Sequence, residues 1–463
     1  MNNQCVTVKP KDPGVNTRPL RKHWKGEMFK RKIHVHFMGI GGSALAGVAI
    51  LAKKYGFEVS GCDLAKETAY SHILAKFGIK YLVGHNVNHL KDVDILAVSP
   101  AVLFTTPLHP EIKEAKKQGL LMTWQEFLGS YLQKGKTVIA IAGTHGKSTI
   151  TAMIGLMMEN GGLDPTVEVG AIVPQWGATV RFGHSKYFVC EADEFNNNFL
   201  NYSPGIIVIN NLEMDHPEFF KDFNHFLSSF VEFIQRLKEP KILIINKEDV
   251  GSQKLLAKME PWLTKEKVKV VDFYRGEIFN LSVPGAHNEL NARAAIVCGK
   301  ELNIDFNKIK SALKNFRGIS RRFELIGEKT GIKVYEDYAV HPTALAATLQ
   351  AARQKYPKQK IWAVFEPHQY SRLKLFLNDF AKTLKLADEI IITAIYPGRE
   401  KINPAIKAED LAQKIGDKAE YLEDFKKVAE KIKEKAQKGE VIIVFGAGKS
   451  YQLARQILQK LNE

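Results

Sequence analysis

The feature that most constrains this chain is a strand-to-helix pattern that begins afresh three times along its 463 residues. Each time, a short apolar run is followed by a helical pattern, and the runs open at Ile33, Thr137 and Ile332. Strands that alternate with helices are typical of parallel sheets wound by crossover helices. The sequence therefore predicts an α/β fold built as three units in series. The predicted segments are a flexible basic tail at 1–32 and domains at 33–134, 135–319 and 320–463.

Individual elements can be bounded within the three units. Helices are expected over 43–54, after the glycine-rich loop as far as Asn160, over 292–299, and from Pro342, which stands at a favoured first helical position. Strands are expected at 57–63, 79–83, 94–99, 137–142, 187–190, 206–209, 241–245, 332–338, 361–365, 389–393 and 441–445.

Composition limits the class of protein. Hydrophobic residues make up 45% of the chain and charged residues 25%, as in soluble globular proteins. No apolar run reaches the roughly 18 residues of a transmembrane helix, and the basic N-terminus lacks the apolar stretch of a signal peptide. The cysteines are too far apart to indicate a disulfide framework or a zinc ribbon, so we expect a cytoplasmic protein without membrane insertion. They are Cys5, Cys62, Cys190 and Cys298.

The formal charge of +16 has three interpretations. It can attract anionic ligands such as nucleotides, bind nucleic acid, or reflect a lysine-rich solvated surface. A nucleic-acid module usually concentrates its positive charge and interleaves aromatic residues. Here lysine alternates with glutamate, as between Asp424 and Lys438, so we expect no nucleic-acid partner.

A glycine-rich loop separates the apolar run 137–142 from the helical pattern that follows it. Glycines let the backbone curl so that several N–H groups face one anion, and the helix N-terminus adds a favourable dipole. Lys147 can reach outer phosphates, and the Ser148 hydroxyl can ligate Mg²⁺. The alternative is an ordinary turn with a surface lysine, because Ile141 stands where the general phosphate-loop motif has its first glycine. The loop residues are Gly143, Thr144, His145, Gly146, Lys147, Ser148 and Thr149.

Acidic residues follow two of the expected strands. Glu191, Asp193 and Glu194 come after the strand at 187–190, and Asp215-His216 comes after the strand at 206–209. The carboxyl ends of parallel strands face the ligand crevice, where a carboxylate can hold Mg²⁺ against phosphates. Taken alone, each cluster fits a solvated acidic loop better than a metal site. Together, at strand ends that follow a phosphate loop, they predict a metal site.

A second glycine-rich turn lies near the start, at Gly39, Gly41 and Gly42, and precedes the helix that opens at Ser43. Its spacing differs from that of nicotinamide-binding enzymes, but backbone amides at a helix N-terminus still suit a pyrophosphate, as in UDP or NAD. Asp63 ends the next strand, where a carboxylate can accept bonds from a ribose or simply form a turn.

Two further patterns have both a functional and a structural interpretation. His287, Asn288 and Asn291 precede the expected helix at 292–299, where asparagine can meet a base edge or cap the helix. Arg321-Arg322 opens the third unit, where an arginine can spread the charge of an acyl-phosphate or belong to a charged linker.

These motifs, in this order, resemble the Mur ligases over the chain from about Ile33 to its end. Ala142-Gly143-Thr144-His145-Gly146-Lys147-Ser148-Thr149 resembles their ATP loop, which folylpolyglutamate synthetases share. The segment from His36 to Ser43 resembles the start of the alanine-adding branch. The resemblance implies a Rossmann-like N-terminal domain, a phosphate-loop central ATPase domain and a Rossmann-like C-terminal domain.

The resemblance also implies roles for single residues. Lys147, His216 and Arg322 would be catalytic. The ATP-binding residues would be the loop from Gly143 to Thr149 with His287, Asn288, Asn291, Arg321 and Asp337. The UDP-sugar would bind at Gly39, Gly41, Gly42, Ser43 and Asp63. The amino acid would bind at Tyr338, His341 and Arg372, and Mg²⁺ at Ser148, Glu191 and His216.

The implied activity is ATP- and Mg²⁺-dependent joining of L-alanine to UDP-N-acetylmuramate, through an acyl-phosphate, in peptidoglycan precursor synthesis by a monomer or homodimer. Val340 and Gln369 depart from the family pattern in the amino-acid region. A ligase that adds a recycled tripeptide to the same sugar nucleotide is therefore the alternative. A dehydrogenase, a nucleic-acid ATPase and a noncatalytic nucleotide sensor fit less well, because they leave the combined motifs unexplained.

Overall fold

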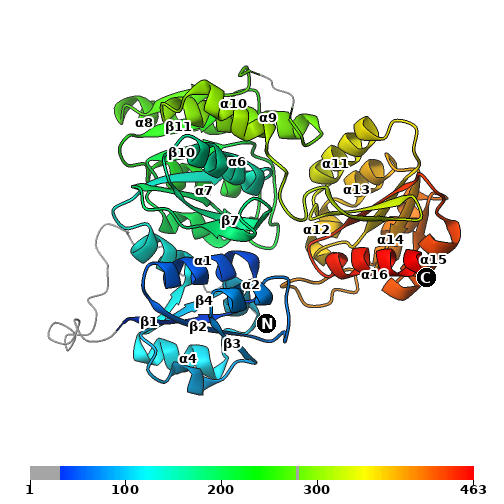
Figure 1. The fold of residues 1–463 in the computed structure, drawn as a ribbon, viewed down its shortest axis with the longest axis horizontal. Helices are drawn as coiled ribbons and strands as arrows, with labels where there is room; N and C mark the ends of the chain where they lie inside the picture. The colour runs from blue at the N-terminus through cyan, green and yellow to red at the C-terminus, as the bar shows by residue number, and fades with distance from the viewer. Residues whose placement is uncertain (1–31, 278–280) are drawn as a thin grey trace.

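The computed structural model describes residues 32–277 and 281–463, and within these ranges its strands form three sheets that follow one another along the chain (Figure 1). Each sheet has buried apolar clusters on both faces. The predicted α/β fold is therefore confirmed. The predicted tail lies outside the described residues apart from Lys32, and the exact domain limits stay a prediction.

The N-terminal sheet has the strand order β3-β2-β1-β4-β5, and its pairs are parallel. Helix α1 spans the predicted residues and stops where Gly56 takes a φ of +94°. The strands are β1 (His34–Met38), β2 (Glu58–Asp63), β3 (Lys80–Val83), β4 (Ile95–Val98) and β5 (Leu121–Thr123). The helical segments are α1 (Ser43–Lys54), α2 (Ser71–Lys76), η2 (Val87–Leu90), α3 (Pro100–Thr105), α4 (Pro110–Gln118), α5 (Trp124–Phe127) and η3 (Leu128–Leu132).

The central sheet has the order β12-β11-β10-β6-β9-β7-β8. Strand β6 lies near its middle between β10 and β9, which explains the continuous apolar run from Val138 to Ala142. The strands are β6 (Thr137–Ala142), β7 (Thr166–Val173), β8 (Ala178–Arg181), β9 (Tyr187–Glu191), β10 (Ile206–Ile209), β11 (Ile242–Ile245) and β12 (Lys269–Asp272). The helical segments are α6 (Lys147–Asn160), η4 (Phe195–Asn201), α7 (Phe223–Ile234), α8 (Val250–Lys265), α9 (Ala286–Glu301) and α10 (Phe306–Lys314).

The C-terminal sheet has the order β13-β14-β18-β15-β16-β17. Helix α11 begins at Pro342 as predicted. The strands are β13 (Glu324–Lys329), β14 (Ile332–Asp337), β15 (Ile361–Phe365), β16 (Glu389–Ile392), β17 (Ala419–Tyr421) and β18 (Val441–Phe445). The helices are α11 (Pro342–Lys355), α12 (Tyr370–Leu375), α13 (Leu377–Leu384), α14 (Ala408–Ile415), α15 (Phe425–Lys435) and α16 (Ser450–Asn462).

Two expectations were wrong in detail. The sheets are not wholly parallel, because β8 pairs antiparallel with β7 and β13 antiparallel with β14. Helix α9 begins at Ala286, not at Ala292, so the segment expected to precede it forms its first turns. Gly285 takes a φ of +102° immediately before it, and this glycine conformation lets the chain turn directly into the helix.

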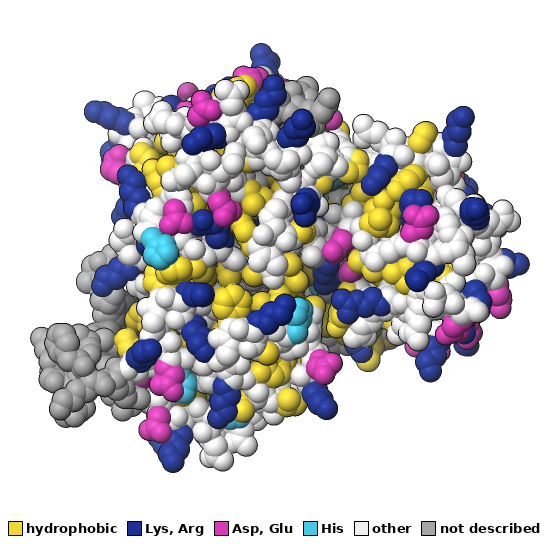
Figure 2. All heavy atoms as spheres, in the orientation of Figure 1, with side chains coloured by type: hydrophobic (Ala, Val, Ile, Leu, Met, Phe, Trp, Pro, Cys, Tyr) yellow, Lys and Arg dark blue, Asp and Glu magenta, His cyan; other side chains and the backbone are white. Residues whose placement is uncertain are grey.

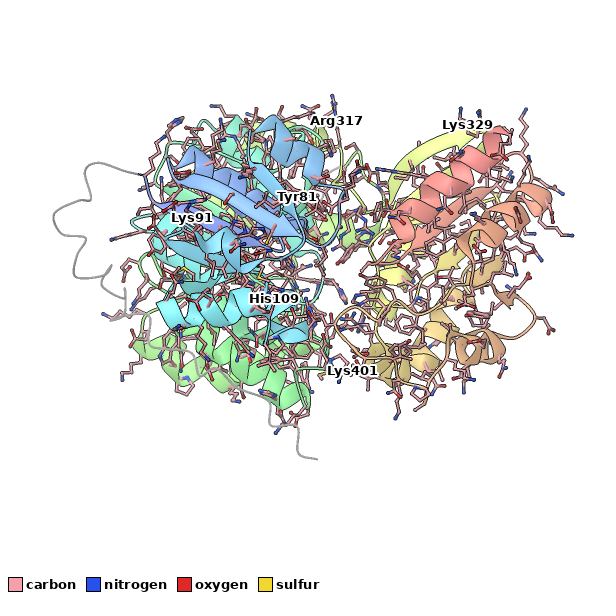
Figure 3. The ribbon with its side chains drawn as sticks, turned by 90° about the horizontal axis from the view of Figure 1, so that it is seen from below. Tyr81, Lys91, His109, Arg317, Lys329 and Lys401 are labelled. Carbon is pink, nitrogen blue, oxygen red and sulfur yellow. The ribbon has the colours of Figure 1, made fainter. Side chains whose placement is uncertain are left out.

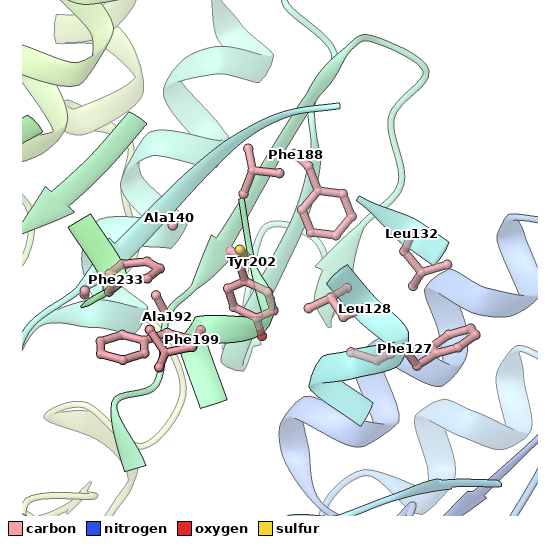
Figure 4. Close-up of a cluster of buried hydrophobic side chains, with 14 of the residues drawn as sticks. Phe127, Leu128, Leu132, Ala140, Phe188, Ala192, Phe199, Tyr202 and Phe233 are labelled. Atoms are coloured by element: carbon pink, nitrogen blue, oxygen red, sulfur yellow. The ribbon is translucent and has the colours of Figure 1, made fainter. Parts of the chain in front are cut away.

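The N-terminal and central units share one apolar core. Phe127, Leu128 and Leu132 from the N-terminal unit belong to the same buried cluster as Phe188 and Tyr202 of the central unit (Figure 4). Helix α1 lies between the two sheets in Figure 1 and contacts β7 and β8. Burial of this much apolar surface holds the two units in one orientation.

The C-terminal unit has separate cores of its own and lies beside the other two (Figures 1 and 3). Its side-chain contacts with the central unit are largely polar, as between Arg372 and Asp215 or Gln369 and Glu218. An interface of this kind is typical of domains that move relative to one another.

The described residues contain no helix long and apolar enough to span a membrane. Lys and Arg side chains are scattered over the face drawn in Figure 2, with Asp and Glu among them. On this face the positive charge is spread out and does not gather into one patch.

Candidate active site

The loop between β6 and α6 is positioned at the carboxyl end of the central sheet. Gly143 and Gly146 take φ values of +118° and +85°, which side chains with a Cβ rarely adopt. The turn brings the amides of the loop to the N-terminus of α6, which opens at Lys147. This arrangement suits an anion, as the sequence predicts.

Residues that follow β10 hold this loop in shape. The Thr144 amide donates to the Asn211 carbonyl at 2.9 Å, and the His145 amide donates to the Asn211 side chain at 2.9 Å. The Asn210 side-chain amide donates to the His145 carbonyl at 3.1 Å and to Asn291 Oδ1 at 3.0 Å. The loop is therefore preorganised by two neighbouring elements, β10 and α9.

Gly146→Ala is expected to lower the affinity for ATP at least tenfold, measured by calorimetric titration. The added Cβ would overlap the Asn291 side chain and lie 2.6 Å from Asn210 Nδ2, so the loop has to shift. Each charge-assisted hydrogen bond lost costs about 1.5–3 kcal/mol. Gly162→Ala is the matched control, because its φ is +81° but nothing lies within 4 Å of the added Cβ. Equal affinity in the two variants would contradict the assignment of the loop.

Lys147 lies between the loop and the acidic residues that follow β9. Its Nζ donates to the Gly143 carbonyl at 2.6 Å and to both Glu194 oxygens at 2.9 and 3.1 Å. Burial opposes its charge, but Glu194, Asp193 and Glu191 hold its pKa above the usual value. The side chain of Lys147 is therefore a positively charged group held in place beside the loop.

Glu191 and Ser148 lie together at the ends of β9 and the loop. The Gly170 amide donates to the Glu191 carboxylate, and the nearby Ser148 hydroxyl favours the charged form of that carboxylate. Burial raises the pKa of Glu191, and burial together with Glu191 raises the pKa of nearby Glu168 well above its usual value. Oε2 of Glu168 has no hydrogen-bond partner. The buried carboxyl group of Glu168 and the half-buried one of Glu191, beside a hydroxyl, offer the oxygen donors that Mg²⁺ prefers.

His216 is grouped with Asp193 and Glu194 rather than with Glu191. One ligand atom from each of the three lies within 4.8 Å of the others. Burial opposes protonation of His216, but Asp215 and Glu218 raise its pKa, and its Nδ1 lies 3.1 Å from Glu218 Oε1. The predicted metal ligands therefore fall into two groups, with Ser148 beside Glu191 and His216 beside Asp193 and Glu194.

The residues predicted to meet adenine lie in the first turns of α9. Asn291 is buried and contacts Asn210, while the Asn288 side chain donates to the Pro284 carbonyl at 2.7 Å. Burial lowers the pKa of His287 to about 4, with smaller contributions from Arg322 and His145. These residues therefore adjoin the loop, and Asn291 bonds within the protein.

Arg321 and Asp337 bond chiefly to the C-terminal unit. Arg321 Nε donates to Glu336 at 2.6 Å, and its guanidinium lies 4.9 Å from the Tyr338 ring centre. Asp337 accepts hydrogen bonds from the Phe323 and Ala339 amides and from Thr348, so both its oxygens are used within the protein.

Arg322 is directed differently from Arg321. Its positive charge acts on Glu191, Asp337 and His287, which come from the central and C-terminal units. It therefore stands where the loop, the acidic residues and the C-terminal unit meet.

Side chains predicted to face the amino acid lie at the junction of the central and C-terminal units. Arg372 is 3% exposed, and its Nη2 and Nε donate to Asp215 Oδ1 at 2.6 and 3.1 Å. His341 Nδ1 caps α11 and lies 3.7 Å from Glu213, while its Nε2 is buried without a partner. Tyr338 is 40% exposed. Gln369 donates to Glu218 at 3.1 Å.

The glycine-rich turn of the N-terminal unit, at Gly39, Gly41 and Gly42, precedes helix α1. The Gly41 amide donates to Asp63 Oδ2 at 3.0 Å, so the carboxylate closes onto the turn itself. Ser43 lies beside Tyr70; burial raises the pKa of Tyr70, while the positive charge of Arg321 opposes that rise. Of the predicted UDP-sugar residues, Ser43 therefore lies near the start of the C-terminal unit, through Tyr70.

Sequence reasoning missed residues that organise the site. Asn210, Asn211 and Glu213 hold the loop and were given no role, whereas Asp193 and Glu194, which the sequence placed in the acidic cluster after β9, are the ones that accompany His216. The three missed residues follow β10 directly, so the rule that drew attention to Glu191 applied to them as well. What the sequence did not indicate was which side chains of each run turn inward.

Comparison with known proteins shows similarity to one family along most of the chain. Models described as "Mur ligase family, catalytic domain", "Mur ligase middle domain" and "Mur ligase, glutamate ligase domain" match residues 34–135, 141–299 and 321–448. UDP-N-acetylmuramate–L-alanine ligase of Acetivibrio thermocellus is 37% identical over 455 residues, covering 92% of this chain and 96% of the relative. The enzyme of that name from Alkaliphilus metalliredigens is 34% identical, covering 92% and 97%.

Solved structures show the same fold. UDP-N-acetylmuramate-alanine ligase of Thermotoga maritima has a TM-score of 0.76 at 26% identity, covering 92% of this chain and 99% of that one. A murein peptide ligase of Psychrobacter arcticus has a TM-score of 0.70 at 23% identity, covering 93% and 99%.

Proposed function

Because this chain belongs to the Mur ligase family, we propose that it joins L-alanine to UDP-N-acetylmuramate with ATP, forming an amide bond. The names of its relatives support the choice of L-alanine, since the two relatives above that are more than 30% identical to this chain are alanine ligases and cover 92% of it. The observation that best supports this proposal is the position of the Lys147 ammonium group between the loop and the acidic residues after β9.

The reaction has two steps. The muramyl carboxylate attacks the terminal phosphorus of ATP, which gives an acyl-phosphate and releases ADP. The amine of L-alanine then attacks the acyl carbon, and phosphate leaves as the amide forms, with one proton lost from the amine.

The position of each side chain indicates its role in these two steps. The loop amides and Lys147 hold the phosphates and carry the charge that develops on the transferred group. Arg322 adds positive charge from the side of the C-terminal unit. Ser148 and Glu191 in one group, and His216 with Asp193 and Glu194 in the other, would hold Mg²⁺, which supplies further charge neutralisation when bound. Closure of the C-terminal unit over the loop would exclude water from the acyl-phosphate.

Phosphate release in the presence of ATP, Mg²⁺ and UDP-N-acetylmuramate tests the proposal when amino acids and short peptides are added one at a time. We expect release to require both the sugar nucleotide and L-alanine, and mass spectrometry to find the amide product. A requirement for a tripeptide instead of L-alanine would favour the recycling ligase. Hydrolysis that needs neither compound would overturn both assignments.

A further inference from the structure

A second group of ligand-type side chains lies inside the N-terminal unit, apart from the phosphate loop. His36 lies on β1, Cys62 on β2, His89 in η2 and Glu111 in α4. One ligand atom from each of the four lies within 4.8 Å of the others. His36, Cys62 and Glu111 are almost wholly buried, and His89 is 15% exposed.

Three of these atoms surround one oxygen of Glu111. Its Oε1 lies 3.7 Å from His36 Nε2, 3.4 Å from His89 Nδ1 and 3.9 Å from Cys62 Sγ. Both of those nitrogens are buried without a hydrogen-bond partner. Unpartnered buried nitrogens are costly, so this convergence needs a physical reason.

Neighbouring groups orient the four side chains. Ser60 Oγ lies 2.8 Å from His36 Nδ1, which leaves Nε2 directed at Glu111. The Asn86 amide donates to Glu111 Oε2 at 2.8 Å, which leaves Oε1 directed inward. His85 Nδ1 lies 3.1 Å from Cys62 Sγ. Supports of this kind, which fix the free atom of each ligand, are typical of metal sites.

We propose that His36, Cys62, His89 and Glu111 form a binding site for a divalent transition metal of the zinc class. Two imidazoles, a thiolate and a carboxylate are a four-ligand set that suits zinc, whereas Mg²⁺ and Ca²⁺ prefer oxygen ligands alone. Tetrahedral bonds of about 2.0–2.3 Å place ligand atoms roughly 3.3–3.6 Å apart. The observed separations around Glu111 need only small adjustments to reach this range.

Charge supports the same assignment. Burial raises the pKa of Glu111 to about 7 and raises the pKa of the Cys62 thiol, so neither anion is well stabilised by the protein alone. A divalent cation bound to one thiolate and one carboxylate forms a neutral centre, which removes this cost.

The site would join α4 and η2 to the sheet. The apolar cluster on this face is small, with Met38, Leu90, Leu96, Val98 and Ile112 among its members. Four bonds to one metal would therefore add substantially to the stability of this face. Asp63, which closes the Gly41 turn, directly follows Cys62, so the metal would also steady that turn.

Titration of the chelator-treated full-length protein with Co²⁺ tests the proposal, because a cobalt–thiolate bond gives a charge-transfer absorption band. We expect one equivalent to bind with this band and Zn²⁺ to displace it. Cys62→Ser should abolish the band, and His89→Gln should weaken binding at least tenfold. Cys298→Ser, which changes another buried free cysteine, should behave as the unmodified protein.

Two outcomes would overturn the proposal. One is Co²⁺ binding without a thiolate band, which would place the metal at the acidic groups of the central unit. The other is a band that survives Cys62→Ser at full intensity. If Cys62→Ser does not fold, His89→Gln decides, because His89 is the most exposed of the four residues and its loss must still weaken binding.

Discussion

Lys147→Ala is expected to lower ATP-dependent phosphate release at least about a thousandfold while leaving UDP-sugar binding nearly unchanged. The lysine belongs to the loop, with its Nζ 2.6 Å from the Gly143 carbonyl, and it lies in the central unit. The predicted UDP-sugar residues lie in the N-terminal unit. Steady-state phosphate release and calorimetric titration with UDP-N-acetylmuramate measure the two effects separately.

Folding has to be checked in this variant, because the substitution leaves Glu194 buried without its partner. Burial already raises the pKa of Glu194, so the carboxyl group can take up a proton when the lysine is lost. Lys134→Ala, which removes an exposed lysine just before β6, is the control and should retain full activity. If Lys147→Ala loses UDP-sugar binding as well, the division of roles between the two units is wrong.

Arg372→Ala is expected to lower kcat/KM at least about a hundredfold and to increase the radius of gyration in X-ray scattering. Arg372 is nearly fully buried and joins the C-terminal unit to Asp215 of the central unit. Removing one partner of a buried ion pair costs about 3–5 kcal/mol, because the other charge stays buried and unpaired. Asp215 precedes His216, so the same change disturbs a predicted metal ligand.

Arg353→Ala is the matched control for this prediction. Arg353 pairs with Asp388 within the C-terminal unit, and both side chains are more than one-third exposed. Exposed pairs of this kind are worth about 0–1 kcal/mol, so activity should change little. Arg372→Lys should fall between the two, because lysine cannot make both bonds. Near-normal activity of Arg372→Ala would show that the junction does not require this pair.

The local pattern of apolar and polar residues was sufficient to predict many of the helices and strands. Strands β6, β10, β15 and β18 match their predicted limits, because each is a continuous apolar run buried on both faces. The start of α11 was readable from Pro342. Strands β5, β8, β12, β13 and β17 were missed, and all five lie at a sheet edge, where a strand has little apolar pattern to distinguish it from a loop. Strand β7, which lies next to the edge strand β8, was missed as well.

The residues of the candidate active site could be predicted only in part from the sequence, for a related reason. The loop at Gly143–Thr149 could be recognised because its glycines, lysine and hydroxyl are consecutive in sequence. The grouping of His216 with Asp193 and Glu194 depends on how β9 and β10 flank β6, and on the unusual φ of +54° at His216. No local pattern carries that information.

The sequence by itself determined the three α/β units, the phosphate loop and the order of the acidic runs, because these follow from hydrophobic period and from residues adjacent along the chain. Only the tertiary structure decided that the first two units share a core, that Arg372 pairs with Asp215, and that His36, Cys62, His89 and Glu111 converge. These contacts join residues far apart in sequence. Which residues meet depends on packing and on the need to pair buried charges and polar groups. Both depend on the three-dimensional arrangement of the whole chain, which no local pattern describes.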